Sequence, residues 1–290
     1  TYVAAPGTYY VSYTYNTLES SRSSGATVTA GASPILSTYP TGTGLYLAYP
    51  FNSGAADASS AGNTGTLVGS PSTTTDRYNQ SGKAYSFNGS SQYITTLKQT
   101  ASPGPTDFSI SVWFKTTTGG GKLVGFGSTQ NVTSGSSSST YDRHIYRTNA
   151  GQIYYGIYPG SVQTIGTATS YADGSWHHVV AITSSTDGSS LYVDGAVVAA
   201  DATMTTCQSY AGYWHVGFDN VNGWTNQPTN AFFTGSLDDI AIYKSALTAS
   251  QVYALYGAGS PPTCAGSSLL LHANGVSGAS YSWTGPNGFT

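Results

Sequence analysis

Short runs in which apolar and polar residues alternate follow one another along most of the chain, separated by clusters of Gly, Asn, Ser and Pro. The clearest run is 108–115, where Phe108, Ile110, Val112 and Phe114 occupy every second position. Because successive side chains of a β-strand point to opposite faces, such a run predicts a strand with one buried face. The repetition of these runs between about residues 38 and 258 predicts a β-sandwich.

Further runs of the same kind predict the other strands. They span residues 45–51, 84–87, 92–95, 152–158, 176–183, 189–193, 196–200, 213–218 and 235–243. Asp194-Gly195 between two of these runs indicates a hairpin, since both central positions of the favoured tight turn need positive φ.

One helix is predicted near the end of this region. Thr248 and Gln251 form a capping box, the apolar face begins at Val252, and Gly257 is placed to end the helix. A sheet-rich chain with one short late helix favours an all-β, two-sheet antiparallel jelly roll over a barrel.

The two ends of the chain differ from the middle. Residues 1–30 predict a strand (8–15), a polar turn and a second strand (26–30), and 31–44 carry the Pro and Gly of a connection. At the other end a Gly- and Pro-rich break at 257–262 precedes predicted strands at 267–273 and 281–283. We therefore divide the chain into 1–37, 38–259 and 260–290; neither flank is long enough to bury a core of its own.

Composition narrows the function. Only 7% of the 290 residues are charged, against about 25% in an average soluble protein. Ser, Thr, Gly and Tyr fill the deficit, and the hydrophobic fraction of 39% still supports a core. The net charge of −3 and the scattered Lys and Arg argue against nucleic-acid and anionic-membrane binding, and no apolar run is long enough to span a membrane.

The composition leads us to expect an extracellular piece of a longer polypeptide, secreted or at the cell surface. Two cysteines, Cys207 and Cys264, are too few for a disulfide framework and leave open one bridge or two buried thiols.

A series of segments in the middle of the chain resembles the LamG-like (laminin G, concanavalin A-like) jelly rolls. The most specific are 173–179 (DGSWHHV) and 191–195 (LYVDG). The others are 45–51 with 57–65, 85–89 with 92–94, 108–115, and 235–243 with 246–248. Their order holds over roughly three quarters of the chain, and the resemblance implies a jelly-roll domain at 38–259.

The flanks resemble the short Ig-like repeats of giant bacterial surface adhesins, including those of gliding bacteria. Residues 6–11 are similar to the last half of such a repeat, and 264–269, 278–283 and 285–289 to the first half of the next. Either each half is completed by chain outside this sequence or the two halves pair with each other. We expect the first arrangement, in which Cys264 pairs beyond residue 290.

The number and placement of the carboxylate side chains argue against catalysis. Glycoside hydrolases share the jelly-roll fold and ordinarily need two Asp or Glu flanking the scissile bond. The chain has a single Glu, Glu19, in a flank, while Asp238 and Asp239 are strand neighbours expected to point to opposite faces. We therefore predict no enzymatic activity.

Calcium is the expected structural ion. Asp238 alternates with Ile240 and Ile242, so we expect its carboxylate to face the core, where it needs compensation. Calcium accepts carboxylate and amide oxygens, which Asp57 and Asn63 of an early loop supply. The LamG resemblance implies that this loop and the last strand meet around one ion. The alternative is an ordinary Asx-turn loop.

Aromatic residues among amides and charged groups are the candidate ligand contacts. Sugars stack on aromatic rings while polar groups hold their hydroxyls, an arrangement of apolar walls with a few placed polar groups. The candidates are Trp224, Asn222, Asp219, Tyr141, Arg143 and Tyr158. The alternative is that these rings cap an open end of the sandwich.

These observations lead us to expect a non-catalytic, glycan-binding module of a secreted multidomain adhesin. It would attach to an extracellular glycan or other surface ligand, with Ig-like repeats of the same chain as neighbours. A spacer that binds nothing is the alternative, and a glycan-degrading hydrolase is a third.

Overall fold

The computed structural model describes residues 7–15, 18–19, 26–28, 44–259 and 280–284. The chain divides into two compact units, Leu36–Ser260 and a smaller one made of Thr1–Ile35 with Pro261–Thr290. Within the described residues no helix has the length and apolar character that crossing a membrane requires.

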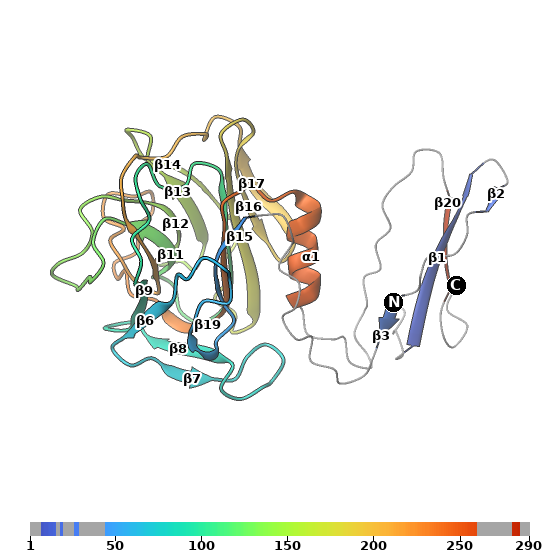
Figure 1. Cartoon of the computed structure of the whole chain (residues 1–290), viewed down its shortest axis with the longest axis horizontal. Helices are drawn as coiled ribbons and strands as arrows, with labels where there is room; N and C mark the ends of the chain where they lie inside the picture. The colour runs from blue at the N-terminus through green and yellow to red at the C-terminus, as the bar shows by residue number, and fades with distance from the viewer. Residues whose placement is uncertain (1–6, 16–17, 20–25, 29–43, 260–279, 285–290) are drawn as a thin grey trace. The chain divides into compact units, whose positions relative to one another are not determined.

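The larger unit is a sandwich of two antiparallel sheets (Figure 1). The first sheet has eight strands in the order β17-β16-β15-β10-β19-β8-β7, with β4 also pairing to β19. Their bounds are β4 (Leu45–Tyr49), β7 (Ser72–Thr74), β8 (Ala84–Asn88), β10 (Phe108–Lys115), β15 (Trp176–Ser184), β16 (Gly188–Val193), β17 (Ala196–Asp201) and β19 (Thr234–Tyr243).

The second sheet has seven strands in the order β14-β13-β12-β11-β18-β9-β6. Their bounds are β6 (Gly65–Val68), β9 (Tyr93–Thr96), β11 (Lys122–Gly127), β12 (Tyr141–Arg147), β13 (Ile153–Ile157), β14 (Gln163–Gly166) and β18 (Tyr213–Val216). The short β5 (Asn52–Ala55) precedes β6. The predicted all-β, two-sheet jelly roll is thus confirmed.

The core lies between the two sheets and follows the predicted alternation. Phe108, Ile110, Val112 and Phe114 of β10 all join this core and are fully buried. Asp194 and Gly195 have φ of 51° and 80° and join β16 to β17, as expected of a tight hairpin.

The predicted helix forms as α1 (Ala249–Gly259) and covers part of the outer face of the eight-stranded sheet (Figure 1). Its capping box is present: the Thr248 N–H donates to Gln251 Oε1 at 2.8 Å, and the Gln251 N–H donates to Thr248 Oγ1 at 3.3 Å. Val252 packs on Val180 and Tyr243 of the sheet. The helix ends at Gly259, two residues beyond the expected stop.

The smaller unit brings the two flanks together. β1 (Gly7–Tyr15) pairs antiparallel with β2 (Leu18–Glu19), β3 (Ala26–Val28) and β20 (Ser280–Thr284). Since β1 and β20 come from the two flanks, the flanks pair with each other in this structure, which is the second of the two arrangements and not the one expected. Pairing supplies β1 with the edge partners that an isolated half would lack. The predicted strand at 267–273 lies outside the described residues.

The structure describes one of the two cysteines. Cys207 carries a free thiol, and burial raises its pKa to about 12. Cys264 lies outside the described residues.

Candidate functional site

A cavity of about 390 Å³ opens beside the seven-stranded sheet, on the side away from the core. It is lined by Ser139, Thr140, Tyr141, Tyr158, Val162, Gln208, Asn222, Gly223 and Trp224. Four of the six predicted ligand residues are among them, namely Tyr141, Tyr158, Asn222 and Trp224. The lining has aromatic walls and hydroxyl or amide groups, and it contains no Asp, Glu, Lys, Arg or His.

Three parts of the chain that are distant in sequence meet at this cavity. Tyr141 begins β12 and Tyr158 follows β13, while Asn222 and Trp224 belong to the connection between β18 and β19. The Tyr141 hydroxyl donates to the Asn222 carbonyl at 2.7 Å, and the Tyr146 hydroxyl donates to the Thr225 carbonyl at 2.5 Å. These bonds hold the connection, residues 217–233, against the sheet.

Trp224 is buried rather than projecting from a loop, with 5% of its surface exposed. Its ring meets the His144 ring edge-on at 4.1 Å between centroids. It also lies directly over Gly156 of β13, where a Cβ would collide with it. Trp224 therefore packs against the sheet, because a glycine in the sheet leaves a place for the ring.

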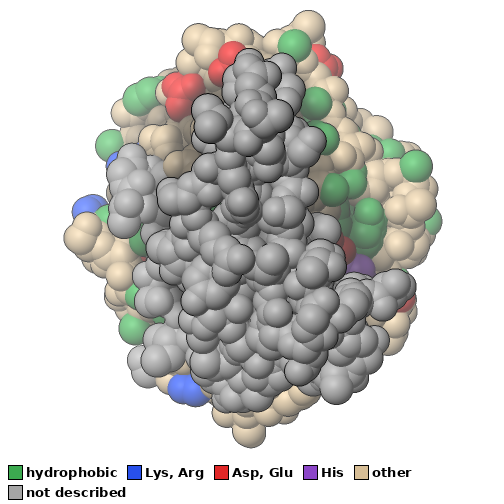
Figure 2. Space-filling view, turned by 90° about the vertical axis from the view of Figure 1, so that its right-hand side faces the viewer, with side chains coloured by type: hydrophobic (Ala, Val, Ile, Leu, Met, Phe, Trp, Pro, Cys, Tyr) green, Lys and Arg blue, Asp and Glu red, His purple; other side chains and the backbone are tan. Residues whose placement is uncertain are grey.

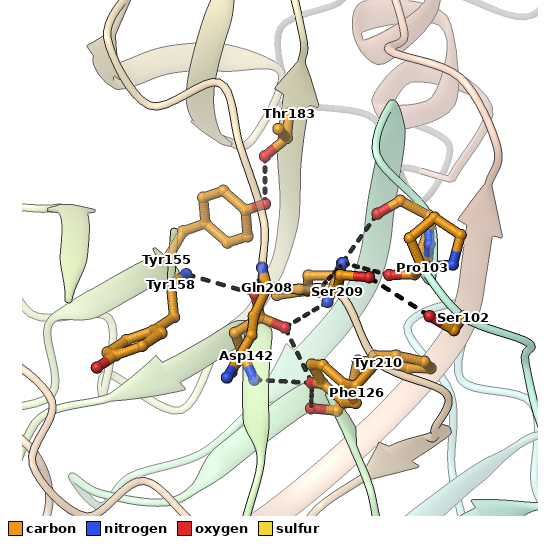
Figure 3. A network of polar contacts seen from close by, with 12 residues as sticks. Ser102, Pro103, Phe126, Asp142, Tyr155, Tyr158, Thr183, Gln208, Ser209 and Tyr210 are labelled. Carbon is orange, nitrogen blue, oxygen red and sulfur yellow. Dashed lines mark hydrogen bonds and ion pairs between the residues drawn. The ribbon is translucent and has the colours of Figure 1, made fainter. Parts of the chain in front are cut away.

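A buried ion pair between Asp142 and Arg143 fixes part of the cavity wall, and Figure 3 shows the polar network around Asp142. The Asp142 carboxylate accepts hydrogen bonds from the N–H groups of Gln208 at 3.0 Å and Tyr158 at 3.4 Å, and from the Tyr210 hydroxyl at 2.9 Å. Arg143 Nη1 lies 2.5 Å from the same carboxylate. Burial raises the pKa of Asp142 despite Arg143, and the bonds position the backbone of two residues that line the cavity.

Arg143 itself does not reach the cavity. Its guanidinium is fully buried and donates to the carbonyls of Pro103 at 3.1 Å, Pro105 at 2.9 Å and Gln208 at 2.7 Å. The prediction of Arg143 as a ligand contact is corrected. Its φ of 49° and a register shift between β11 and β12 mark an irregular stretch of β12, where Arg143 turns toward the interior and anchors loops.

Asp219 is likewise a buried structural residue rather than a lining residue. Its carboxylate accepts from the N–H groups of Ser138 at 3.0 Å and Asn220 at 2.7 Å. Burial opposes its ionisation, but Lys122 and His215 with these two N–H groups outweigh it and hold the pKa of Asp219 below its usual value. It thereby fixes the start of the connection that carries Trp224.

The residues predicted to hold calcium make other contacts. Asp57 Oδ1 accepts from the N–H groups of Ala48 and Ser59, each at 2.9 Å, and Oδ2 accepts from the Asn63 N–H at 2.6 Å. The Asn63 side-chain amide donates to the Tyr46 carbonyl at 2.5 Å. The Asp57 carboxylate thus accepts from backbone N–H groups of its own loop, as in an Asx-turn.

Asp238 faces the outer side of its sheet, together with Asp239. Arg77 Nη1 lies 2.5 Å from Asp238 Oδ2, and its Nη2 contacts Asp239 Oδ2. Asp239 has a φ of 44°, and the pairing of β10 with β19 shifts register here, so a β-bulge breaks the alternation. The expectations that Asp238 faces the core and that the two carboxylates point to opposite faces are therefore wrong. Both carboxylates lie on the outer face, and Arg77 compensates their charge there.

The fit to a metal can be judged on these contacts. The Asp57 loop and Asp238 do not form one oxygen cage, although Asn63 Oδ1 is buried without a hydrogen-bond partner. Within the described ranges no three His, Cys, Asp or Glu side chains are arranged to hold a metal ion.

Sequence comparison identifies one family. The profile of the concanavalin A-like lectin/glucanases superfamily matches residues 88–253, more than half of the chain. No curated protein matches the sequence.

Solved structures with the same fold include a domain of an enzyme and binding domains of toxins. Domain 4 of AbnA, a GH43 extracellular arabinanase from Geobacillus stearothermophilus solved with arabinotriose, has a TM-score of 0.54 and 19% identity over 73% of this chain and 98% of that domain. The binding domain of Paraclostridial Mosquitocidal Protein 1 has a TM-score of 0.55 and 17% identity over 74% of this chain and 52% of that one. The botulinum neurotoxin serotype G binding domain has a TM-score of 0.52 and 13% identity, with 73% and 50% covered. At these identities the likeness concerns the fold, and this chain spans about half of each toxin domain.

Proposed function

The chain belongs to the concanavalin A-like lectin/glucanases superfamily, and on that premise we propose that it is a non-catalytic module that binds a neutral glycan in the cavity at Trp224. The observation that carries this proposal is the lining of the cavity. Tyr141 and Tyr158, which are half-buried, offer aromatic surface for the CH faces of a sugar, with the small exposed part of Trp224 in the same lining. Asn222 and Gln208 offer amides for its hydroxyls. With no Asp, Glu, Lys, Arg or His in the lining, the cavity suits a sugar without charged substituents.

The comparisons lend support at the level of the fold. Domain 4 of the arabinanase was solved with arabinotriose, a neutral trisaccharide, and the toxin domains are binding domains. Because one fold hosts many functions, the cavity of this chain and not its fold is the main support for glycan binding.

A binding role agrees with the carboxylates better than a hydrolytic one does. Glycoside hydrolysis needs two carboxyl groups on either side of the scissile bond, and the lining provides none. The adjacent Asp238 and Asp239 are buried against Arg77 and do not line this cavity.

The proposal is tested by screening the protein on an array of neutral and acidic glycans and titrating the neutral ones that bind, arabinotriose among them. Tyr158→Ala and Asn222→Ala remove one ring and one amide from the lining. Each is expected to weaken binding about tenfold, which is roughly 1.4 kcal/mol.

Tyr253→Ala on α1 and Asn131→Ala in an exposed loop remove the same side chains elsewhere and should leave the affinity unchanged. If no neutral glycan binds the wild-type protein, the module is better described as a spacer in a longer filament. Release of reducing sugar from a bound polysaccharide would favour the hydrolase instead.

We propose further that the module works in a secreted surface adhesin, as the resemblance of its flanks to Ig-like repeats suggests. The test is the parent polypeptide, in which tandem Ig-like repeats and surface exposure to antibody on intact cells are expected. An intracellular parent protein would contradict this role.

Calcium binding at the Asp57 loop also stays a prediction. A ligand that binds only the folded state raises the melting temperature, so chelation should lower it by several degrees and Asp57→Asn should abolish that response. A melting temperature that does not change on addition of the chelator would contradict calcium binding.

A further inference from the structure

A second cavity of about 500 Å³ lies in the jelly-roll unit, apart from the cavity at Trp224. The two share no lining residue. Its walls come from the start of β4 with Tyr46, from residues 98–101 after β9, from residues 104–107 before β10, and from Lys244 at the end of β19.

Its charge distinguishes it from the rest of the surface. Of the eight Lys and Arg in the described part of the chain, only Lys98, Lys115 and Lys244 are exposed. Two of these three line this cavity. In a protein with so few charges, two lysines in one hollow give it a positive potential that the first cavity lacks.

Among the described residues, the lining of this cavity holds two lysines and one carboxylate, Asp107, which leaves a net positive charge. Neither Lys98 nor Lys244 takes part in an ion pair there. The one acid in the lining, Asp107, accepts from the N–H of Ser185 at 2.7 Å and from its hydroxyl at 3.0 and 3.1 Å. Lys244 Nζ lies 3.9 Å from the centre of the Tyr46 ring, so its charge is held at the cavity wall by a cation–π contact.

The walls are fixed by bonds to the rest of the sandwich. The Thr100 N–H donates to the Gly212 carbonyl at 2.7 Å, and the Gly212 N–H donates to the Thr100 carbonyl at 2.9 Å. The Thr100 hydroxyl lies 2.9 Å from the Tyr46 hydroxyl. On the facing side, Arg143 holds the carbonyls of Pro103 and Pro105. A ligand would therefore meet a hollow that is already shaped, which lowers the entropic cost of binding.

We propose that this cavity is a second saccharide site, and that it takes the acidic group of an anionic polysaccharide between Lys98 and Lys244. The shared chemistry is a carboxylate or a sulfate ester carried on a hydroxylated body. Gln99 and Thr106, which are both exposed, supply neutral polar groups for that body. The proposal stands on the charge of this cavity and not on ligand binding at Trp224.

The experiment compares two double variants that remove the same number of positive charges. Lys98→Gln with Lys244→Gln removes the lysines of the cavity, and Lys83→Gln with Lys115→Gln removes two lysines outside it. Each protein is titrated with a galacturonate oligosaccharide, a sulfated oligosaccharide and a neutral arabino-oligosaccharide. The two acidic probes distinguish carboxylate from sulfate as the recognised group.

We expect the wild-type protein and the Lys83/Lys115 variant to bind at least one acidic probe with equal affinity. The Lys98/Lys244 variant should bind it about tenfold more weakly or worse, and added salt should weaken the wild-type interaction. Absence of acidic binding, or equal weakening by both double variants, would overturn the proposal. Neutral binding reports on the first cavity separately: Tyr158→Ala should reduce it and leave acidic binding intact.

Discussion

Lys122 is fully buried beneath the connection that carries Trp224, and its ammonium nitrogen has no hydrogen-bond partner among the described residues. Its chain passes over Gly125 and beside His144, whose two ring nitrogens are likewise buried and unpartnered within that part of the protein. Burial lowers the pKa of Lys122 to about 8, against the opposing pull of Asp219 and Asp142. A charged lysine in this place costs stability at neutral pH.

This cost predicts an unusual pH dependence. The folded protein releases the Lys122 proton near pH 8, whereas the unfolded chain keeps it up to about 10.5. The unfolded state therefore binds more protons between these values, and stability owed to Lys122 rises with pH there. Lys122→Met removes the cost of the buried charge, so we expect it to be more stable than the wild type at pH 7. This difference in the free energy of unfolding should shrink by about 2 to 3 kcal/mol between pH 7 and pH 10.

Urea unfolding of both proteins at several pH values measures this difference. Lys115→Met, which changes an exposed lysine, serves as the control and should show no such trend. A difference between Lys122→Met and wild type that stays constant with pH would show that Lys122 keeps an ordinary pKa in the folded protein.

Strands β12 and β13 form the sheet face that holds the candidate site. His144 and Gly156 are register partners on these strands. The absence of a side chain at Gly156 leaves the place that the Trp224 ring fills. The position of Trp224 is therefore decided by a glycine in a neighbouring strand as much as by its own loop.

Gly156→Ala should displace Trp224 without straining the backbone, because Gly156 lies in a strand and not in the left-handed region. We expect overpacking to cost about 1 to 3 kcal/mol of stability and to weaken neutral glycan binding. Gly135→Ala, where an added Cβ meets no atom within 4 Å, should change neither. Retention of both stability and binding in Gly156→Ala would mean that Trp224 is not seated as described.

At the level of elements, the sequence predicts strands well where apolar residues alternate. The bounds of β10 agree with the predicted 108–115, and those of β13, β15 and β16 agree to within about a residue at each end. β11 and β12 are not predicted, because β11 contains two glycines and β12 buries Asp142, Arg143 and His144. Their polar groups satisfy one another or bind loops, which no pattern of hydrophobicity reveals.

Individual site residues depend on details that the sequence does not express. The aromatic and amide residues around Trp224 can be recognised as candidate contacts, and four of them line one cavity. The roles of Arg143 and Asp238 cannot be recognised from the sequence. The role of Arg143 depends on how it lies in a strand that is not predicted, and that of Asp238 depends on a β-bulge. The buried partner of Asp238, Arg77, lies 161 residues away in sequence.

At the scale of the whole molecule, the two cavities described above differ in character and lie on a weakly charged part of the jelly-roll unit. On the face drawn in Figure 2, few charged side chains are seen where described atoms are visible. The cavity at Trp224 is neutral and aromatic, and the cavity at Lys98 and Lys244 is positive. A surface of this kind favours recognition by stacking and hydrogen bonding, with charge used at one place.

The central claim is that a neutral glycan binds in the cavity at Trp224, and the most direct test is an amide chemical-shift map. Nitrogen-15-labelled protein is titrated with the neutral oligosaccharide that binds best on the array. The largest shifts are expected at Tyr141, Tyr158, Gln208 and residues 222–224, with residues 98–107 unmoved. The absence of shifts, or shifts confined to a different surface, would contradict the claim.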